Sequence, residues 1–555
     1  MQELAASTIA NELKIPHLIA RLLVRRGYTS VSEAYSILNT SSFPEHDPYL
    51  MNGMKEAVDY VRRILENPKA RVLIFGDYDL DGMTSTALLV LALKKLGIEA
   101  AWKLPCRFDS GYGLSQKAVD EIHESGVTHL ITVDTGITAV TEIEYANSKG
   151  IQVMVLDHHQ PSGDGLPACE VLLDPHQESC DYPNPFLCGV GIAYKLVSAL
   201  FQELSIPGAE DYLDLVALGT LADLVPLSPE NRLLVRGGLA KIKQSKLPGI
   251  RELCEVQLGD RKQIGGQEVL FRLAPLMNAP GRMEKPDIAM ELLICEDAAK
   301  AKQLVQELNR FNTLRKKKET EITKATMDWV ETRYPNGVPD VLVVDGENWH
   351  LGVIGIVAAK VAQHFGRPTA ILSIQPDGSA HASARAMYGF NWHRALFECR
   401  HLFSRWGGHA NAAGFNLKKE NIETLRNSLL DFAKKEPPDF ASASATDYDI
   451  PIALSELNEE VMDHLQKMEP YGGSFPYPVF RAEKVKLLRV REVRGGHLQM
   501  ELAQDRQHSF SAIAFGMGKM ESELKKGKEI NVNFEVSWNS FNGMRNIQLM
   551  IKSID

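Results

Sequence analysis

The stretch RVLIFGDYDLDGMTS, residues 71–85, decides how the rest of the chain is interpreted. It opens with an apolar run, Val72 to Phe75, that ends at a glycine, as in a buried parallel strand. Three carboxylates follow at alternate positions, Asp77, Asp79 and Asp81. An extended backbone would send all three side chains to one side, beyond the carboxyl end of the strand. Such close carboxylates repel one another, so a hard divalent metal is indicated; the alternative is a solvated acidic turn that caps the next helix.

The segment from 71 to about 225 alternates short apolar runs with helical patterns. THLITVD (128–134) and IQVMVLD (151–157) are further strand-like runs, whereas TALLVLALKKLG (86–97) has the pattern of a helix. This alternation predicts an α/β fold with a doubly wound parallel sheet and crossover helices.

Polar residues stand where these runs end. Asp134 ends one run, the group Asp157, His158 and His159 ends the next, and Asp223 follows an apolar run in LADLVPL. Each of them alone is more often a helix cap or a surface side chain. Together, carboxylates and imidazoles at one sheet edge suit two Mn²⁺ or Mg²⁺ ions, and a set without thiolates argues against zinc. The predicted metal ligands are Asp77, Asp79, Asp81, Asp134, His158 and Asp223.

Composition narrows the class of protein. The 555 residues exceed the size of one domain core, and 44% hydrophobic with 24% charged residues is typical of soluble globular proteins. The net charge of −10 does not indicate a nucleic-acid partner, so any polyanion site must be local. The seven scattered cysteines form no CxxC pair and fit a reducing cytoplasm. No apolar stretch approaches about 18 residues and the N-terminus lacks the order of a secretory signal, so we expect no membrane partner.

The motifs GDYDLDG, VDTG, LDHH and LADLVPL resemble those of the DHH phosphoesterase superfamily. The segments 46–58, 104–115 and 174–196 are similar to one branch of it, the RecJ family of bacterial single-stranded-DNA-specific exonucleases. The resemblance implies, in chain order, an N-terminal helical segment (1–70), a DHH catalytic domain (71–295), a connecting helix (296–335), a second α/β, DHH-associated domain (336–435) and an OB-fold (450–555).

Two groups of residues are candidates for binding the substrate. In LFRLAPLMNAPGRM, the resemblance implies that Asn278 and Arg282 contact the substrate backbone; the alternative is a loop that closes the first domain. The motifs SAR and GGH indicate a phosphate site, because glycines let the backbone approach an anion, histidine donates to it and arginine clamps it. The alternative for the second motif is a tight turn. The residues of these motifs are Ser383, Arg385, Gly407, Gly408 and His409.

The sequence beyond about 450 predicts a small β-barrel. About five strand-like segments separated by polar turns suit an OB-fold, a common binder of single strands. In the fourth, alternate residues from Ile530 to Trp538 are apolar, so one face is buried. Segment 481–494 holds six basic and two acidic residues, which favours a polyanion partner. Ser474-Phe475-Pro476 stands where the family usually shows Gly-Asn-Pro, and Thr135 and Pro280 are milder departures.

The combined interpretation is a metal-dependent 5′→3′ exonuclease that releases 5′-mononucleotides from single-stranded DNA, in repair and recombination. Asp81, Asp134 and His159 are the predicted catalytic residues, with Asp157 orienting the motif. The 5′ polarity, the preference for DNA, and a single-strand-binding protein and a RecQ-type helicase as partners come from the resemblance. We expect a monomer.

Two alternatives remain at this point. One is a DHH-family phosphodiesterase of short oligonucleotides or cyclic dinucleotides, which the barrel of about a hundred residues argues against. The other is a non-enzymatic DNA-binding scaffold, which would need eroded motifs, whereas here the acids and both histidines are present.

Overall fold

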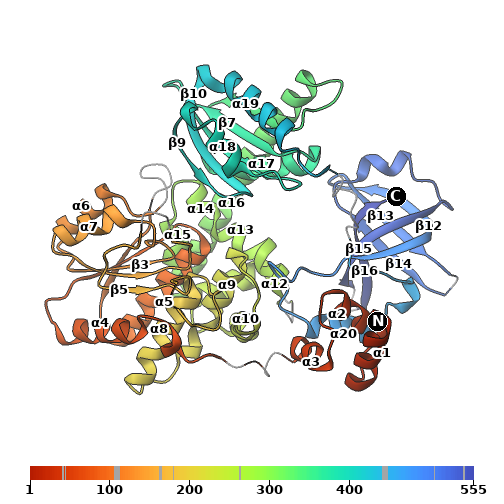
Figure 1. Cartoon of the computed structure of the whole chain (residues 1–555). Coiled ribbons are helices and arrows are strands. Elements are labelled where there is room, and N and C mark those ends of the chain that lie inside the picture. The colour runs from red at the N-terminus through yellow and green to blue at the C-terminus, as the bar shows by residue number, and fades with distance from the viewer. Residues whose placement is uncertain are drawn as a thin grey trace.

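The computed structural model shows three lobes joined by a long helix and by extended segments (Figure 1). It describes residues 1–39, 43, 45–105, 113–161, 165–178, 180–259, 261, 264–440, 448–505, 507–541 and 544–555. Parts of the family-like segments 104–115 and 174–196 and of the linker 434–449 therefore lie outside the described residues.

The first lobe contains a five-stranded parallel sheet of order β2-β1-β3-β4-β5. Its strands are β1 (Val72–Gly76), β2 (Ala100–Lys103), β3 (His129–Val133), β4 (Gln152–Leu156) and β5 (Val171–Leu173). Alternate residues face opposite sides, so Ile74 and Ile131 pack towards α5 (Leu80–Lys95) and α8 (Gly189–Glu203). Phe75 and Leu130 pack towards α6 (Gln116–Glu124) and α7 (Val140–Ser148). The predicted doubly wound parallel sheet is confirmed.

Short helices complete this lobe. The apolar run before Asp223 is a helix, α9, whose residues from Leu215 to Leu221 are all buried. Burial on every side removes the periodicity that would separate such a helix from a strand in the sequence. The elements are η3 (Ala209–Tyr212), α9 (Leu213–Asp223), α10 (Pro229–Lys241), η4 (Ile242–Gln244), α11 (Pro248–Leu258), α12 (Gly266–Glu268), η5 (Val269–Leu273), α13 (Ala274–Met277), α14 (Ala279–Arg282) and α15 (Asp287–Leu293).

The predicted connecting helix is α16 (Ala298–Arg333), which begins at the capping residue Asp297. The helix contains a run of four basic residues, 315–318, which could face a polyanion. Arg315, the first of them, is buried and donates to Glu319 at 3.1 Å. Glu319 also pairs with Lys360 of the second lobe, so this arginine joins two lobes instead of facing a ligand.

The second lobe is a mixed five-stranded sheet of order β6-β7-β8-β10-β9. Helices α16 and α17 pack on one face, where Val344 and Ile371 lie, and α18 and α19 pack on the other, where Val343 and Leu372 lie. The elements are β6 (Leu342–Glu347), α17 (Leu351–Phe365), β7 (Thr369–Ile374), β8 (Ser379–Arg385), α18 (Trp392–Glu398), η6 (Arg400–Leu402), β9 (Phe403–Gly408), β10 (Ala412–Lys418), η7 (Lys419–Asn421) and α19 (Ile422–Lys435).

The third lobe is a barrel, closed by the pairing of β12 with β15. The five predicted strands are β12 to β16, and the two-residue β11 adds a sixth at the edge of β12. Alternate residues of β15 from Ile530 to Val536 are buried, as the pattern indicates. Arg481 pairs with Glu483 and Asp555, and these contacts neutralise part of the predicted positive excess. The elements are β11 (Ile450–Pro451), η9 (Leu454–Glu456), α20 (Glu459–Lys467), β12 (Phe480–Val493), β13 (His497–Ala503), β14 (Ser509–Ala514), η10 (Gly518–Ser522), β15 (Glu529–Phe541) and β16 (Met544–Ile554).

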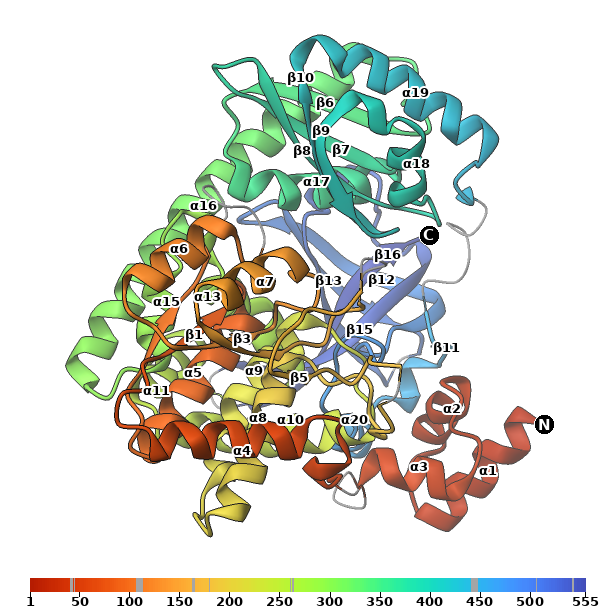
Figure 2. The ribbon, with the colours of Figure 1, turned by 60° about the vertical axis from the view of Figure 1, so that its left-hand side comes forward.

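The N-terminal helices divide between two lobes. In both views α1–α3 lie beside α20 near the barrel, and α4 lies on the first lobe (Figures 1 and 2). Arg26 donates from Nε and Nη2 to the two carboxylate oxygens of Asp449 at 2.9 and 3.0 Å. The two residues are 423 positions apart in the sequence. The helices are α1 (Gln2–Leu13), α2 (His17–Arg25), α3 (Val31–Leu38), η2 (Pro48–Leu50) and α4 (Met54–Glu66).

Glu469, between α20 and the barrel, makes the stability of this packing depend on pH. Its Oε2 accepts from the backbone N–H of Tyr471 at 2.8 Å and of Gly266 at 3.2 Å. Burial raises the pKa of Glu469 from 4.5 to about 7, so the folded chain favours the protonated acid. This stabilisation is complete below about pH 4.5 and is lost as the pH rises through about 7.

We expect Glu469→Gln to unfold at a higher temperature than the wild type at pH 8 and at the same temperature at pH 4.5. The amide oxygen keeps both acceptor roles, and the difference at pH 8 amounts to about 1–3 kcal/mol. Thermal melts of both chains at the two pH values test this. An equal difference at both pH values would contradict it.

Candidate metal centre and phosphate site

The centre lies at the carboxyl ends of β1, β3 and β4, where the strand order of the sheet reverses. Asp77 follows β1, Asp134 follows β3 and Asp157 follows β4, and all three are buried. Open α/β sheets bind their ligands at this switch point. Asp134 has a φ of 57°, a left-handed backbone that non-glycine residues adopt mainly at functional sites.

The backbone from Asp77 to Asp81 is not extended, so period-two spacing does not explain how the three carboxylates lie. Asp79 caps α5 and accepts from the N–H groups of Asp81 at 3.0 Å and Gly82 at 3.1 Å, so the chain turns into a helix there. The carboxylates still converge, because Asp77, Asp79 and Asp134 offer oxygens within 4.8 Å of one another. The acidic turn does cap a helix, but Asp77 and Asp81 are buried instead of solvated.

Asp81 faces a second group of ligand atoms. Its carboxylate accepts from the N–H groups of Gly189 at 2.7 Å and Val190 at 3.0 Å, at the start of α8. It lies within 4.8 Å of ligand atoms of His158 and Asp223, the last residue of α9. The amides of Gly189 and Val190 were not predicted. Every residue except proline has a backbone N–H, so the sequence does not mark these two, and only the fold brings them to Asp81.

The motif at the end of β4 is organised by Asp157. Its carboxylate accepts from the N–H groups of Ile137 at 2.9 Å and His158 at 2.8 Å, and pairs with His159 Nδ1 at 2.7 Å. The neighbouring His158 has a different partner, with Nε2 at 3.1 Å from Asp134 Oδ1. Asp134, His158 and His159 form a further group of atoms able to hold a metal.

Three carboxyl groups of this cluster, those of Asp79, Asp81 and Asp134, have raised pKa values. Burial raises the pKa of Asp81 to about 8, and the charges of Asp223 and Asp79 add to the effect. Burial and neighbouring acids likewise raise the pKa values of Asp79 and, more strongly, of Asp134. Two buried and two partly buried acids, gathered this closely, therefore fit a divalent cation, which compensates their charge.

His159 differs from His158 in its protonation. Burial lowers the pKa of His158, and so does the charge of His159. Burial would also lower the pKa of His159, but the hydrogen bond to Asp157 outweighs it and raises the pKa to about 9. His159 is therefore a cation at neutral pH, and His158 is the neutral imidazole that a metal requires.

The first turn of α17 gathers the predicted substrate residues of two lobes. A methyl group on Gly352 would collide with the backbone of Arg282, and one on Gly355 would lie 2.9 Å from Ser383 Oγ and 3.0 Å from Arg385 Nη2. These two glycines were not predicted. They let the helix N-terminus approach the backbone of Arg282, whose Nη1 donates to the carbonyl of Gly352 at 3.3 Å, and the side chains of Ser383 and Arg385. A serine and an arginine at a helix N-terminus are suited to a phosphate.

The candidate phosphate site and the candidate metal centre are neighbours. A methyl group on Gly281 would lie 3.3 Å from the carbonyl oxygen of Tyr78, so α14 lies against the loop that carries Asp77 and Asp79. Asn278, at the start of α14, has a buried Oδ1 with no hydrogen-bond partner among the described residues.

Gly407, Gly408 and His409 are exposed at the end of β9. They adjoin Arg385 through β10, where Ala412 pairs with Arg385 and Ala413 with Gly408. The turn that was weighed as the alternative is present, since His409 N–H donates to Ala412 at 2.9 Å.

The barrel carries an aromatic hollow of about 470 Å³ between α20, β14 and the β15–β16 hairpin. The guanidinium of Arg545 lies 3.7 Å from the ring centre of Trp538. The Nε1 of Trp538 is buried and finds no hydrogen-bond partner in the described part of the chain. The alternation along β15 indicated Trp538 as a core residue, and its arginine partner could not be predicted.

The fold and the site define a phosphoesterase of the DHH class. The family model "DHH family, N-terminal domain" matches residues 71–220, the DHHA1 domain matches 339–435 and the RecJ OB domain matches 448–553. The chain belongs to the RecJ family of single-stranded-DNA-specific exonucleases. No helix in the described part of the chain has the length and apolarity needed to cross a membrane.

Relatives support this membership along nearly the whole chain. RecJ of Bacillus subtilis (strain 168) is 35% identical over 98% of this chain and 69% of its own. RecJ of Escherichia coli (strain K12) is 32% identical over 98% of this chain and 96% of its own. The crystal structure of RecJ from Thermus thermophilus with Mn²⁺ superposes with a TM-score of 0.82 at 27% identity, covering 99% of this chain and 77% of that one.

Proposed function

We propose that this chain is a metal-dependent exonuclease that degrades single-stranded DNA from the 5′ end to 5′-mononucleotides, in repair and recombination. The observation that supports the proposal most directly is the contact of α14, which carries Arg282, with the Tyr78 loop that carries Asp77 and Asp79. The membership in the RecJ family supports the same substrate.

Two Mn²⁺ or Mg²⁺ ions would be held by Asp77, Asp79, Asp81, Asp134, His158 and Asp223. When bound, such ions lower the pKa of an attacking water and neutralise charge on the scissile phosphate. Asp134 offers oxygens to two of the groups of ligand atoms, and Asp81 is held by the amides of Gly189 and Val190. Both would therefore be central ligands of the metal centre.

The remaining residues act on the strand itself. His159, cationic and held by Asp157, would bind a phosphate oxygen or deliver a proton to the leaving oxygen. Asn278, Arg282, Ser383, Arg385, Gly407, Gly408 and His409 would hold the backbone on the two sides of the scissile bond, so that attack is aligned.

The domain limits proposed for these roles are 71–295 for the catalytic domain, 336–435 for the phosphate-holding domain and 450–555 for the barrel. We also propose a cytoplasmic monomer that works beside a single-strand-binding protein and a RecQ-type helicase. Size-exclusion chromatography and pull-downs with the two purified proteins test these assignments.

The test of the activity uses a 40-mer single strand labelled at either end, with Mn²⁺ and with EDTA. We expect early release of the 5′-labelled mononucleotide, abolished by EDTA and by Asp134→Asn. An intact 40-mer with hydrolysed dinucleotides would instead support the alternative, a phosphodiesterase of short or cyclic substrates. Binding without cleavage under all metals would refute both.

The hollow at Trp538 favours the long substrate, since an arginine stacked on an indole is a platform for a nucleobase. We expect Trp538→Ala to weaken binding of a 40-mer about tenfold, equal to one lost stacking contact, and to leave dinucleotide hydrolysis unchanged. Fluorescence anisotropy in EDTA measures the binding. Phe397→Ala, which removes an exposed aromatic of the second lobe, is the control and should bind as the wild type.

A further inference from the structure

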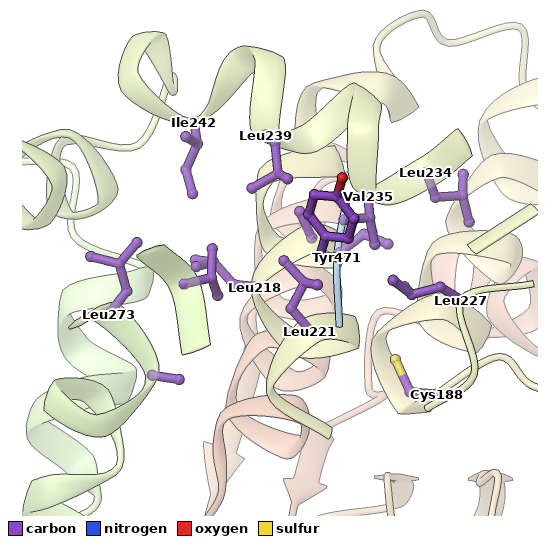
Figure 3. Packing of buried hydrophobic residues seen from close by; sticks show 14 of the residues in the cluster. Cys188, Leu218, Leu221, Leu227, Leu234, Val235, Leu239, Ile242, Leu273 and Tyr471 are labelled. Atoms are coloured by element: carbon purple, nitrogen blue, oxygen red, sulfur yellow. The ribbon is translucent and has the colours of Figure 1, made fainter. Parts of the chain in front are cut away.

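The junction segment, residues 469–475, leads into the barrel but packs inside the first lobe. Figure 3 shows Tyr471 inserted among Leu221, Leu227 and Val235. Its hydroxyl donates to the carbonyl of Leu465 in α20 at 2.6 Å. A side chain of the barrel's approach segment thus completes the core beneath α9, the helix that ends at Asp223.

Gly473 touches the backbone that directly follows Asp223. A methyl group on Gly473 would lie 2.5 Å from the carbonyl oxygen of Leu224 and 2.8 Å from that of Val225. Leu224 has a left-handed backbone, with φ 62°, and ends α9. Such a backbone at a non-glycine residue persists only where its surroundings hold it, and the junction segment is one of those surroundings.

Phe475 anchors the segment between two arginines from different parts of the chain. Its ring centre lies 4.8 Å from the guanidinium of Arg26, which follows α2, and 4.6 Å from that of Arg232 in α10. Arg232 is buried and also donates to the carbonyls of Met468 at 2.7 Å and Pro470 at 3.1 Å. This aromatic ring stands at one of the positions where the sequence departs from the family pattern.

The same segment reaches the start of the helices that carry Arg282. Glu469 accepts from the N–H of Gly266, and a methyl group on Gly266 would collide with the carbonyl of Tyr471. One short stretch therefore contacts both the Asp223 turn and the first turn of the substrate-binding region.

We infer that the junction segment braces the metal centre, with Gly473 and Tyr471 as positioning residues that set where Asp223 lies. The inference rests on the proposed role of Asp223 as a metal ligand. It couples the seating of the barrel to metal binding, because a shift of the segment moves the Leu224 turn and the neighbouring carboxylate. Ligands displaced by about 0.5 Å are no longer in productive geometry.

Gly473→Ala tests the brace, with Ser474→Ala as the matched control at the next exposed position. Mn²⁺ binding to the full chain without DNA is followed by the electron paramagnetic resonance signal of the free ion. We expect Gly473→Ala to need about tenfold more Mn²⁺ for half-saturation and for half-maximal cleavage. Mutating a residue that supports a metal ligand typically lowers metal affinity about 10- to 100-fold, and the expected effect is at the lower end of this range. Ser474→Ala should match the wild type.

Two readouts separate positioning from a general loss of structure. Gly473→Ala should still fold and melt cooperatively in EDTA and should bind the 40-mer with unchanged affinity. Unchanged Mn²⁺ affinity, or weaker DNA binding as the sole effect, would overturn the brace. The Mn²⁺ titration needs no cleavage, so it decides the brace even for a chain that binds Mn²⁺ without cutting DNA, an outcome that would refute the proposed function alone.

Phe475→Ala gives a second perturbation, because it leaves the guanidiniums of Arg26 and Arg232 facing a gap. We expect the Mn²⁺ requirement to rise in the same direction, and Phe475→Tyr to restore it. A rise that Phe475→Tyr does not restore would count against positioning through the ring. If Phe475→Ala does not fold, Gly473→Ala decides the question, since the three atoms nearest to its added methyl are backbone atoms of Leu224 and Val225 and none is a core side chain.

Discussion

Asp134→Asn is expected to reduce the exonuclease rate by about a thousandfold or more and to raise the melting temperature of the metal-free chain. Asp134 offers oxygens to two of the three groups of ligand atoms and lies 3.1 Å from His158 Nε2. Residues that act as a unit are not additive, so the loss of one of them removes most of the rate enhancement that the whole unit provides. Asparagine suits this position because it tolerates the left-handed backbone that alanine would strain.

The gain in stability follows from the same geometry. Burial, together with the charges of Asp81 and Asp79, raises the pKa of Asp134, so its ionised form is unfavourable in the folded chain at neutral pH. A neutral amide removes this cost when no metal is bound. Thermal melts in EDTA at pH 7 and single-turnover cleavage with Mn²⁺ measure the two effects.

Asp174→Asn is the matched control for this substitution. Asp174 is a buried acid after β5, and burial raises its pKa to about 7, but it belongs to none of the groups of ligand atoms found among the described residues. The Asp174→Asn chain should melt at a higher temperature than the wild type and should keep the wild-type exonuclease rate. Asp134→Asn with activity within about tenfold of the wild type would contradict the assignment of the metal centre.

Arg385→Ala is expected to lower kcat/KM on a single strand by about a hundredfold. Its Nη1 donates to Ser383 Oγ at 3.1 Å and to the carbonyl of Ala384 at 2.8 Å, so the guanidinium is fixed towards the first turn of α17. A charged, two-pronged hydrogen bond to phosphate contributes about 3 kcal/mol, and this corresponds to the expected loss.

Arg385→Lys should fall between Arg385→Ala and the wild type, since it keeps the charge and loses the fork that matches a phosphate. Arg394→Ala removes the same charge from an exposed position of the same lobe and should cleave as the wild type. Steady-state rates on the 40-mer measure all three. Equal rates for Arg385→Ala and Arg394→Ala would show that this lobe does not hold the phosphate.

The sequence predicted the parts of the site that lie close together along the chain. Asp77, Asp79 and the Asp157-His158-His159 group stand directly after apolar runs, so their place at a sheet edge follows from strand geometry. The backbone after Asp77 is not extended, because Asp79 is a good helix cap. This local preference outweighs the alternate spacing of the three acids.

The contacts that could not be predicted join residues far apart in sequence. Gly473 meets Leu224, Gly352 meets Arg282 and the amide of Gly189 meets Asp81. In each case the chemical group is a backbone atom, which every residue possesses, so residue type carries no signal. Only the packing of whole helices decides which backbone atoms become neighbours.

The pairing of Arg26 with Asp449 spans 423 residues and bears on how the chain folds as it is made. At about 5–20 residues per second, a ribosome needs about 20 to 85 s between the synthesis of these two residues. Throughout that interval α20 and β11 have not yet been synthesised, so the surface of α2 that packs against them is exposed to chaperones or to other nascent chains. Helix α2 is therefore made long before the segments that it packs against, and an interrupted translation leaves it undocked.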